Sequence, residues 1–181
     1  MNSSIERFSE LSRVVDFLQS IGLEMVQRQS VKGFVNHVRI VAGAIEFDAK
    51  CSFADLLHEC GHVAIVPAEF RGHLNDDVEE SFQKIFELYV DLELDDPRKI
   101  AFMQAGDAEA TAWTWAAGKK LGLADKQIIR DRDYQGAGAD QRLALSMRHH
   151  YGIQGLRRSG MCAHKFKFDK QYPEMLRWVQ S

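Results

Sequence analysis

The chain has 181 residues, a hydrophobic content of 45% and a formal net charge of −3 at pH 7. This composition is ordinary for a globular protein, and the length is sufficient for one domain with a substantial core. No apolar run approaches the roughly 20 residues of a membrane-spanning helix, and residues 1–7 are too polar to begin a signal peptide. We therefore expect a single domain over residues 1–181 and no membrane partner.

The cysteines bear on the compartment in which the protein works. There are three, Cys51, Cys60 and Cys162, and no two of them form a Cys-x-x-Cys pair. Disulfides are typical of oxidising compartments, whereas reduced thiols are typical of the cytoplasm. The odd number and the spacing therefore favour a cytoplasmic location.

The first part of the chain is predicted to contain one helix and a small sheet. Apolar residues at helical spacing indicate a helix over residues 5–21, which Gly22 ends. Three β-prone stretches follow at residues 24–27, 34–41 and 44–47. Because these stretches are short and separated by turn residues, we expect one small three-stranded sheet.

Helical periodicity dominates the rest of the chain. Pro67 ends the helix predicted at residues 53–66. Asn75 and Asp76 are expected to cap the helix predicted at residues 77–94, and Asp96-Pro97 breaks it. The helices are expected at residues 53–66, 77–94, 97–103, 106–118, 125–133, 139–151 and 172–179. The predicted fold class is therefore α+β, a mainly helical domain with a small three-stranded sheet.

The helix predicted at residues 53–66 carries the sequence His58-Glu59-Cys60-Gly61-His62. Residues four apart in a helix lie one above the other, so the two imidazoles point the same way and can share one Zn²⁺. Glu59 lies about 100° round the same helix. There it can accept a proton from a metal-bound water, as the general base of a zinc hydrolase does.

The surroundings of this motif favour a metal site. The opposite face of the helix is apolar, with Leu56, Leu57, Cys60, Val63 and Ala64, so we expect the helix to be buried. Burying two imidazoles and a carboxylate is costly unless each finds a partner, and a metal ion with its bound water satisfies all three. The alternative is a pair of core histidines bonded to the backbone, with Glu59 reaching solvent.

A catalytic zinc needs a third protein ligand. The extended form of the motif would place a histidine at position 68, which is occupied by Ala68. The third ligand is therefore expected to be a carboxylate from a later helix. Glu109 is the candidate that we favour, and Glu80 and Glu87, in the preceding helix, are its rivals.

Glu109 belongs to an alanine-rich helix that Asp107, or the glycine before it, can cap. Ala112 and Ala116 share the face of Glu109 and are small enough to let this helix lie close against the histidine helix. Close approach is what a short carboxylate needs to reach a metal held by another helix. The alternative is that Glu109 is an ordinary solvated residue.

Three segments together carry a family resemblance: Gly43-Ala44-Ile45-Glu46-Phe47-Asp48, Leu56-Leu57-His58-Glu59-Cys60-Gly61-His62 and Glu109-x-x-Ala112-x-x-Trp115-Ala116. They resemble the zincin-like metallopeptidases of the ImmA/IrrE type, which have a short strand, a His-Glu-x-Gly-His helix and a later helix that supplies the third ligand. The resemblance covers about residues 43–120. It implies a zincin-like fold, with His58, His62 and Glu109 as metal ligands and Glu59 as catalytic base.

Charge is unevenly distributed. Residues 1–118 contain 10 Lys and Arg against 20 Asp and Glu, whereas residues 119–181 contain 13 against 6. The metal-site core, about residues 43–120, is therefore followed by a basic, helical part at residues 121–181. This part could pair with the acidic remainder within the fold, or bind an acidic peptide or nucleic acid. His164-Lys165-Phe166-Lys167-Phe168 suits stacking on bases, but the same alternation is typical of an amphipathic strand, so a nucleic-acid partner is not expected.

The sequence favours a zinc-dependent metallopeptidase that hydrolyses a peptide bond in a peptide or protein substrate. Such a site also needs a donor for the oxyanion. The C-terminal third offers Tyr134, His149, His150, Tyr151 and His164, and the sequence does not choose between them. The alternative is a non-catalytic regulatory or binding protein that retains a zincin scaffold. Glu59 argues against that alternative, because a structural zinc site has no use for a carboxylate there.

Overall fold

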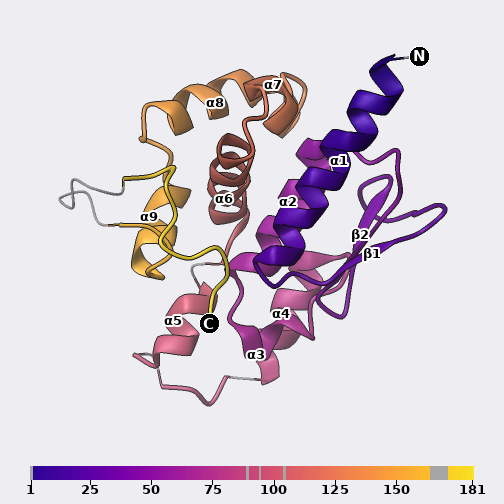
Figure 1. The fold of residues 1–181 in the computed structure, drawn as a ribbon. Helices are drawn as coiled ribbons and strands as arrows, with labels where there is room; N and C mark the ends of the chain where they lie inside the picture. Colours follow the sequence, from indigo (N-terminus) through magenta and orange to yellow (C-terminus); the bar gives the residue numbers. More distant parts are fainter. Residues whose placement is uncertain (1, 89, 94, 104, 164–170) are drawn as a thin grey trace.

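The computed structural model describes residues 2–88, 90–93, 95–103, 105–163 and 171–181. It consists mainly of helices, with one small sheet at one side, next to α1 and α2 (Figure 1). The elements are α1 Asn2–Ser20, β1 Met25–Gln27, β2 Val38–Val41, β3 Ala44–Phe47, α2 Phe53–Ile65, α3 Ala68–Arg71, α4 Val78–Leu88, α5 Pro97–Met103, α6 Asp107–Lys120, α7 Asp125–Ile128, α8 Gly138–Ser146 and α9 Gly152–Arg158. The predicted class, α+β and mainly helical with a three-stranded sheet, is confirmed. No helix within the described ranges is long and apolar enough to span a membrane.

The sheet has β3 at its centre. β3 pairs in parallel with β1 and antiparallel with β2, so the strand order is β1-β3-β2. The β2–β3 turn uses Ala42 and Gly43, both with positive φ, at 49° and 80°. The carboxylate of Glu46, in the middle of β3, is buried and accepts hydrogen bonds from Arg28 Nε at 2.9 Å and Arg39 Nε at 2.7 Å. These two guanidinium groups lower the pKa of Glu46, which explains how the sheet can bury a charge.

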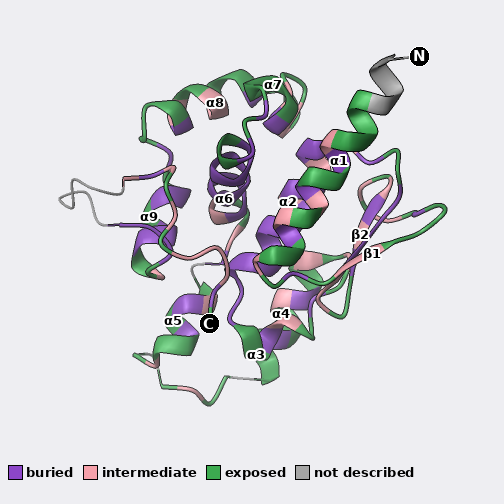
Figure 2. Ribbon diagram, in the orientation of Figure 1, coloured by how far each residue is buried: buried purple, intermediate pink, exposed green. Residues whose placement is uncertain are grey.

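The centre of the core is the contact between α2 and α6, two helices that are buried along most of their length (Figure 2). They approach closely because Gly61 lies at the contact: a Cβ on this residue would be 2.9 Å from the carbonyl oxygen of Ala110. The hydroxyl of Thr114 also donates a hydrogen bond of 3.1 Å to the carbonyl of Leu57. α9 packs on another side of α6, and α1 contacts α2 and β1.

The C-terminal segment differs from its prediction. The helix expected at residues 172–179 is wrong: residues 171–181 run as turns and irregular backbone. Three hydrogen bonds of 2.8 Å tie the segment to the core, from Tyr172 Oη to Ala112 O, from Trp113 Nε1 to Trp178 O and from Gln180 N to Ala64 O. These bonds pair a side chain and two backbone groups of the segment with α2 and α6, and Pro173 disfavours helical backbone at the residue before it.

Two other predicted helices are shorter or divided. The helix expected at residues 125–133 ends at Ile128, because Ile129 has extended backbone, with φ −137° and ψ 118°. The helix expected at residues 139–151 ends at Ser146, and α9, which was not predicted, begins six residues later. Arg148, with φ 60°, lies in the break between α8 and α9.

The segments around α4 and β2 are also shorter than predicted. α4 ends at Leu88 instead of residue 94, and the side chain that caps it is Asp77, whose Oδ1 accepts the Glu80 N–H at 2.9 Å. The strand expected at residues 34–41 is regular only from Val38. The cation–aromatic alternation at residues 164–168 lies outside the described residues.

The α2–α6 contact generates a stability prediction. We expect Gly61→Ala to lower the free energy of unfolding by about 1–2 kcal/mol, because overpacking costs roughly 1–3 kcal/mol and the helix propensity of alanine returns at most about 1 kcal/mol. Urea denaturation followed by circular dichroism measures this change. Gly72→Ala is the control, since a Cβ there meets nothing within 4 Å. If both variants were as stable as wild type, the close approach at Gly61 would not limit the packing.

Candidate metal centre

The start of α2 fixes the direction of the two histidines. Ser52 has extended backbone and its hydroxyl oxygen accepts the N–H of Asp55 at 3.1 Å, so the helix is capped one turn before the motif. The uninterrupted helix then places His58 and His62 with ring centroids 4.8 Å apart. Their Nε2 atoms are 3.2 Å apart. The structure therefore brings the two imidazoles to one point.

Asp107, the first residue of α6, brings a carboxylate oxygen to the same point. Its Oδ1 is 3.1 Å from His58 Nε2 and 3.7 Å from His62 Nε2. Ligand atoms about 2.0–2.1 Å from a tetrahedral Zn²⁺ are separated from one another by roughly 3.3 Å. The three donor atoms are thus spaced as the ligands of one such ion would be, and two imidazoles with a carboxylate are a suitable donor set.

Hydrogen bonding alone does not satisfy these three groups. A neutral imidazole carries one N–H, whereas His58 Nε2 has two close neighbours, Asp107 Oδ1 and His62 Nε2. If His58 Nε2–H donates to Asp107, no hydrogen is left for the contact with His62. If it donates to His62, none is left for the contact with the ionised carboxylate of Asp107. A cation shared by the three atoms removes the conflict. The Nδ1 atoms of both rings are buried without a hydrogen-bond partner among the described residues.

The pKa shifts of the histidine pair agree with a site that holds one cation. Burial opposes protonation of His58, but the hydrogen bond and charge of Asp107 outweigh it and raise the His58 pKa. Burial and the neighbouring His58 lower the pKa of His62 well below its usual range. The hydrogen bond with His58 lowers the pKa of Asp107. The two imidazoles are therefore not both positively charged beside the single carboxylate.

Glu59 lies next to this group and is not part of it. Its side chain is 6% exposed and lines both clefts that border His58. It forms no hydrogen bond or ion pair within the described part of the chain, and burial raises its pKa to about 7. A buried carboxylate without a partner, beside three convergent donor atoms, is positioned to accept a proton from a bound water.

The structure does not bring Glu109 into the group. Its carboxylate lies against α9, where Oε1 is 2.1 Å from the position that a Cβ on Gly155 would occupy. Asp107 and Glu109 are about 200° apart around α6, so they face different neighbours. The face of α6 that meets α2 contains Asp107, Ala110 and Thr114, whereas the expected face contained Glu109. The helix was identified from the sequence, and its orientation differs from the prediction.

The rival carboxylates also lie elsewhere. Glu80 is exposed on α4 and forms an ion pair of 2.6 Å with Lys84. Glu87 is exposed and accepts a hydrogen bond of 3.4 Å from Gln83. Neither belongs to the group of donor atoms around His58.

Two clefts meet at His58 and Glu59. One, of about 180 Å³, extends toward the loop between α7 and α8 and is lined by Arg130, Asp133 and Tyr134. The other, of about 500 Å³, extends toward the start of α4 and also contains His62 and Asp107. A chain lying across both clefts would pass over the convergent donor atoms.

Of the five residues considered as oxyanion donors, Tyr134 lies in a cleft beside the histidines. Its ring centroid is 6.3 Å from that of His58, and its hydroxyl is 2.8 Å from Thr111 Oγ1. His150 is buried, with Nδ1 accepting the N–H of Gly152 at 3.3 Å. The other three are placed differently: Tyr151 and His149 are exposed, and His164 lies outside the described residues.

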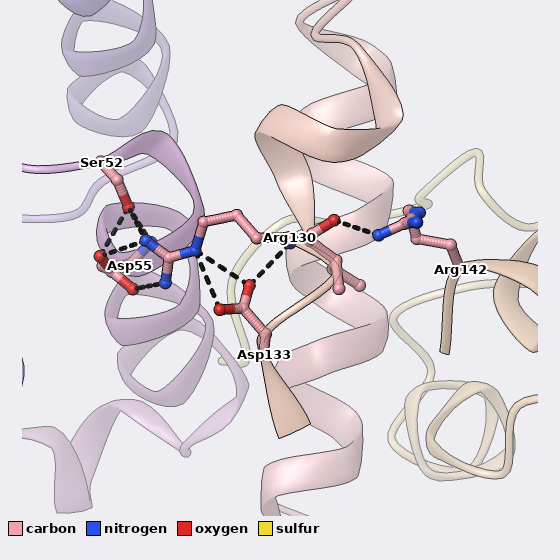
Figure 3. Close-up of polar contacts among 6 residues, drawn as sticks. Ser52, Asp55, Arg130, Asp133 and Arg142 are labelled. Carbon is pink, nitrogen blue, oxygen red and sulfur yellow. Dashed lines mark hydrogen bonds and ion pairs between the residues drawn. The ribbon is translucent and has the colours of Figure 1, made fainter. Parts of the chain in front are cut away.

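An ion-pair network joins the segment that precedes Tyr134 to α2 (Figure 3). Arg130 binds both carboxylate oxygens of Asp55 on α2, and its Nε donates to Asp133 Oδ1 at 2.9 Å. The next residue, Tyr134, and Gln135 have φ values of 56° and 58°, a left-handed conformation that costs roughly 1–2 kcal/mol for a residue other than glycine. Arg130 therefore joins a strained loop to the helix that carries the histidines.

Comparison with known proteins gives no match: no protein-family model, curated protein or solved structure matches the chain.

The donor geometry generates a prediction about metal binding. Asp107→Ala and His58→Ala should each weaken Zn²⁺ affinity by more than the roughly 10–100-fold that loss of a supporting contact costs, because each removes a ligand. Glu109→Ala, Glu80→Ala and Glu87→Ala should leave the affinity close to wild type. Competition with a chromophoric chelator measures all five. Loss of binding in Glu109→Ala together with retention in Asp107→Ala would instead make Glu109 the third ligand.

Proposed function

We propose that the protein is a zinc-dependent peptidase that hydrolyses a peptide bond in a peptide or protein substrate. The observation that carries this proposal is the convergence of His58 Nε2, His62 Nε2 and Asp107 Oδ1 beside the buried carboxylate of Glu59. Three protein ligands leave one position of a tetrahedral ion open, which is the arrangement of catalytic and not of structural zinc.

His58, His62 and Asp107 would hold the ion in this proposal. Bound there, Zn²⁺ would lower the pKa of a water molecule to about 7 and polarise the scissile carbonyl. Glu59 has the role of general base: it accepts a proton as the water oxygen bonds to the carbonyl carbon. It then returns that proton to the amine nitrogen as the C–N bond breaks, so that each product leaves with its proper complement of hydrogens.

Tyr134 has the role of oxyanion donor. Thr111 Oγ1 donates to the carbonyl of Asp107 at 2.8 Å, which uses its only hydrogen, so the hydroxyl of Tyr134 is the donor in their 2.8 Å contact. Burial raises the pKa of Tyr134 to about 12, which keeps the hydroxyl protonated at neutral pH. In the proposed reaction this O–H turns from Thr111 to the oxygen that becomes negative during attack.

The resemblance to the ImmA/IrrE-type zincins supports the same reaction class. In the proposed site, Asp107 replaces Glu109, which the resemblance implied as the third ligand. The proposed location is the cytoplasm, in keeping with the three cysteines, which are all buried and unpaired.

The alternative, a binding protein with a vestigial zincin scaffold, would give the Glu59 carboxylate no role. Burial of an unpartnered carboxylate is costly, so a catalytic role is the better explanation.

The role of Glu59 can be separated from metal binding. Glu59→Gln should retain zinc and thermal stability, because Glu59 is not a ligand, and should lower peptide hydrolysis by about 10²–10⁴-fold, because it removes the proton acceptor. Zinc content by mass spectrometry and cleavage of a quenched-fluorescent peptide library provide the two measurements. Equal cleavage by wild type and Glu59→Gln would exclude the general-base role.

The role of Tyr134 predicts a different kinetic change. Tyr134→Phe should lower kcat by roughly 10²-fold or more while KM changes little, because the lost hydrogen bond belongs to the transition state. Tyr151→Phe, which alters a tyrosine that is 73% exposed, is the matched control and should be unaffected. A Tyr134→Phe enzyme with wild-type kcat would show that another group stabilises the oxyanion.

A further inference from the structure

The two clefts that meet at His58 differ in charge. In the smaller cleft, the carboxylates of Asp55 and Asp133 are both paired with Arg130. The larger cleft contains the carboxylates of Asp76, Asp77 and Glu79 in addition to those of the candidate site, and the described residues that line it include no Lys or Arg. One side of the site therefore carries negative charge that the cleft does not neutralise.

The three additional carboxylates are held at the start of α4. Asp76 Oδ2 accepts the N–H of Phe34 at 2.5 Å, and Asp77 Oδ1 accepts the N–H of Glu80. Backbone N–H groups orient these carboxylates but supply no full positive charge. Carboxylates gathered in a cleft, where water is partly excluded, attract a cation more strongly than the same groups spread over a surface.

Two further features of the cleft point to a ligand with both an apolar and a charged part. Phe34 is 88% exposed at the cleft, and Phe82 provides a second aromatic wall. Glu59 also lines the cleft; this residue is 6% exposed, and its carboxylate forms no hydrogen bond or ion pair among the described residues. An aliphatic stem that ends in a cation would cover the aromatic rings and reach the carboxylates.

We propose that the larger cleft binds a Lys or Arg side chain of the substrate, close to the scissile bond, so that the enzyme selects basic peptides. This inference rests on the proposed function, and it names the substrate class for that site. Apart from Glu59, which lines both clefts, the carboxylates of the smaller cleft are paired with Arg130, so the selection operates on one side of the scissile bond. The cleft, and not the basic C-terminal third, then determines which peptides bind.

The test measures binding without requiring cleavage. Full-length wild-type protein, freed of zinc with a chelator so that peptides bind without being cleaved, is titrated into fluorescent alanine-based peptides that carry, at each position in turn, lysine or the uncharged isostere norleucine. At one or two positions, lysine should bind about tenfold more tightly, the equivalent of about 1.4 kcal/mol, and the difference should shrink as salt is raised. Equal binding of lysine and norleucine peptides at every position, or no binding of any lysine peptide at millimolar concentration, would overturn the proposal.

Matched charge variants locate the effect. Adding Asp77→Asn and Glu79→Gln should abolish most of the lysine preference, while asparagine preserves the helix cap at position 77. Adding Glu80→Gln and Glu87→Gln removes the same charge from α4 outside the cleft and should preserve the preference. If both pairs reduced it equally, net charge and not the cleft would be responsible.

Cleavage by the wild-type protein separates this proposal from the proposed function. Lysine-selective binding without Glu59-dependent cleavage would reject the peptidase and retain the basic-peptide site. Glu59-dependent cleavage that is indifferent to lysine would retain the peptidase and reject the site.

Discussion

The close approach of α6 to α2 at Gly61 is the contact on which the candidate site depends. Without a side chain at Gly61, the backbone of Ala110 can lie against α2, and the first residue of α6 then stands beside the histidines. The contact joins two segments that are far apart in the sequence. The geometry of the candidate metal centre is thus a consequence of helix packing as well as of the His58-Glu59-x-x-His62 spacing.

The part of the site that lies within one helix could be predicted from the sequence. His58 and His62 are one turn apart, so their convergence follows from helix geometry, and Glu59 follows from the same geometry. The third carboxylate depends on which face of α6 meets α2. Asp107, Ala110 and Thr114 form a stripe of suitable spacing, as do Glu109, Ala112 and Ala116, and only the contact at Gly61 distinguishes them.

The predicted fold is correct where local sequence determines the structure and incorrect where contacts between distant segments determine it. Strands β1 and β3 and helices α2 and α6 have local signals, such as apolar periodicity and capping residues, and the structure contains them near the predicted positions. The segment at residues 171–181 has helical periodicity but pairs its polar groups with α2 and α6. The network of Arg130 with Asp55 is likewise non-local, since 75 residues separate the two, and no periodicity reports it.

The C-terminal segment also completes the helix that carries the histidines. The last carbonyls of a helix lack partners within it, and in α2 the carbonyl of Ala64 is satisfied by the N–H of Gln180, while Arg71 donates to the carbonyls of Val63 and Val66. Arg71 in turn binds the carbonyl of Gln180. During synthesis, α2 therefore leaves the ribosome long before the residue that closes its end. The carbonyl of Ala64 can gain this partner only after Gln180 has emerged, so this end of α2 is completed later than the helix itself.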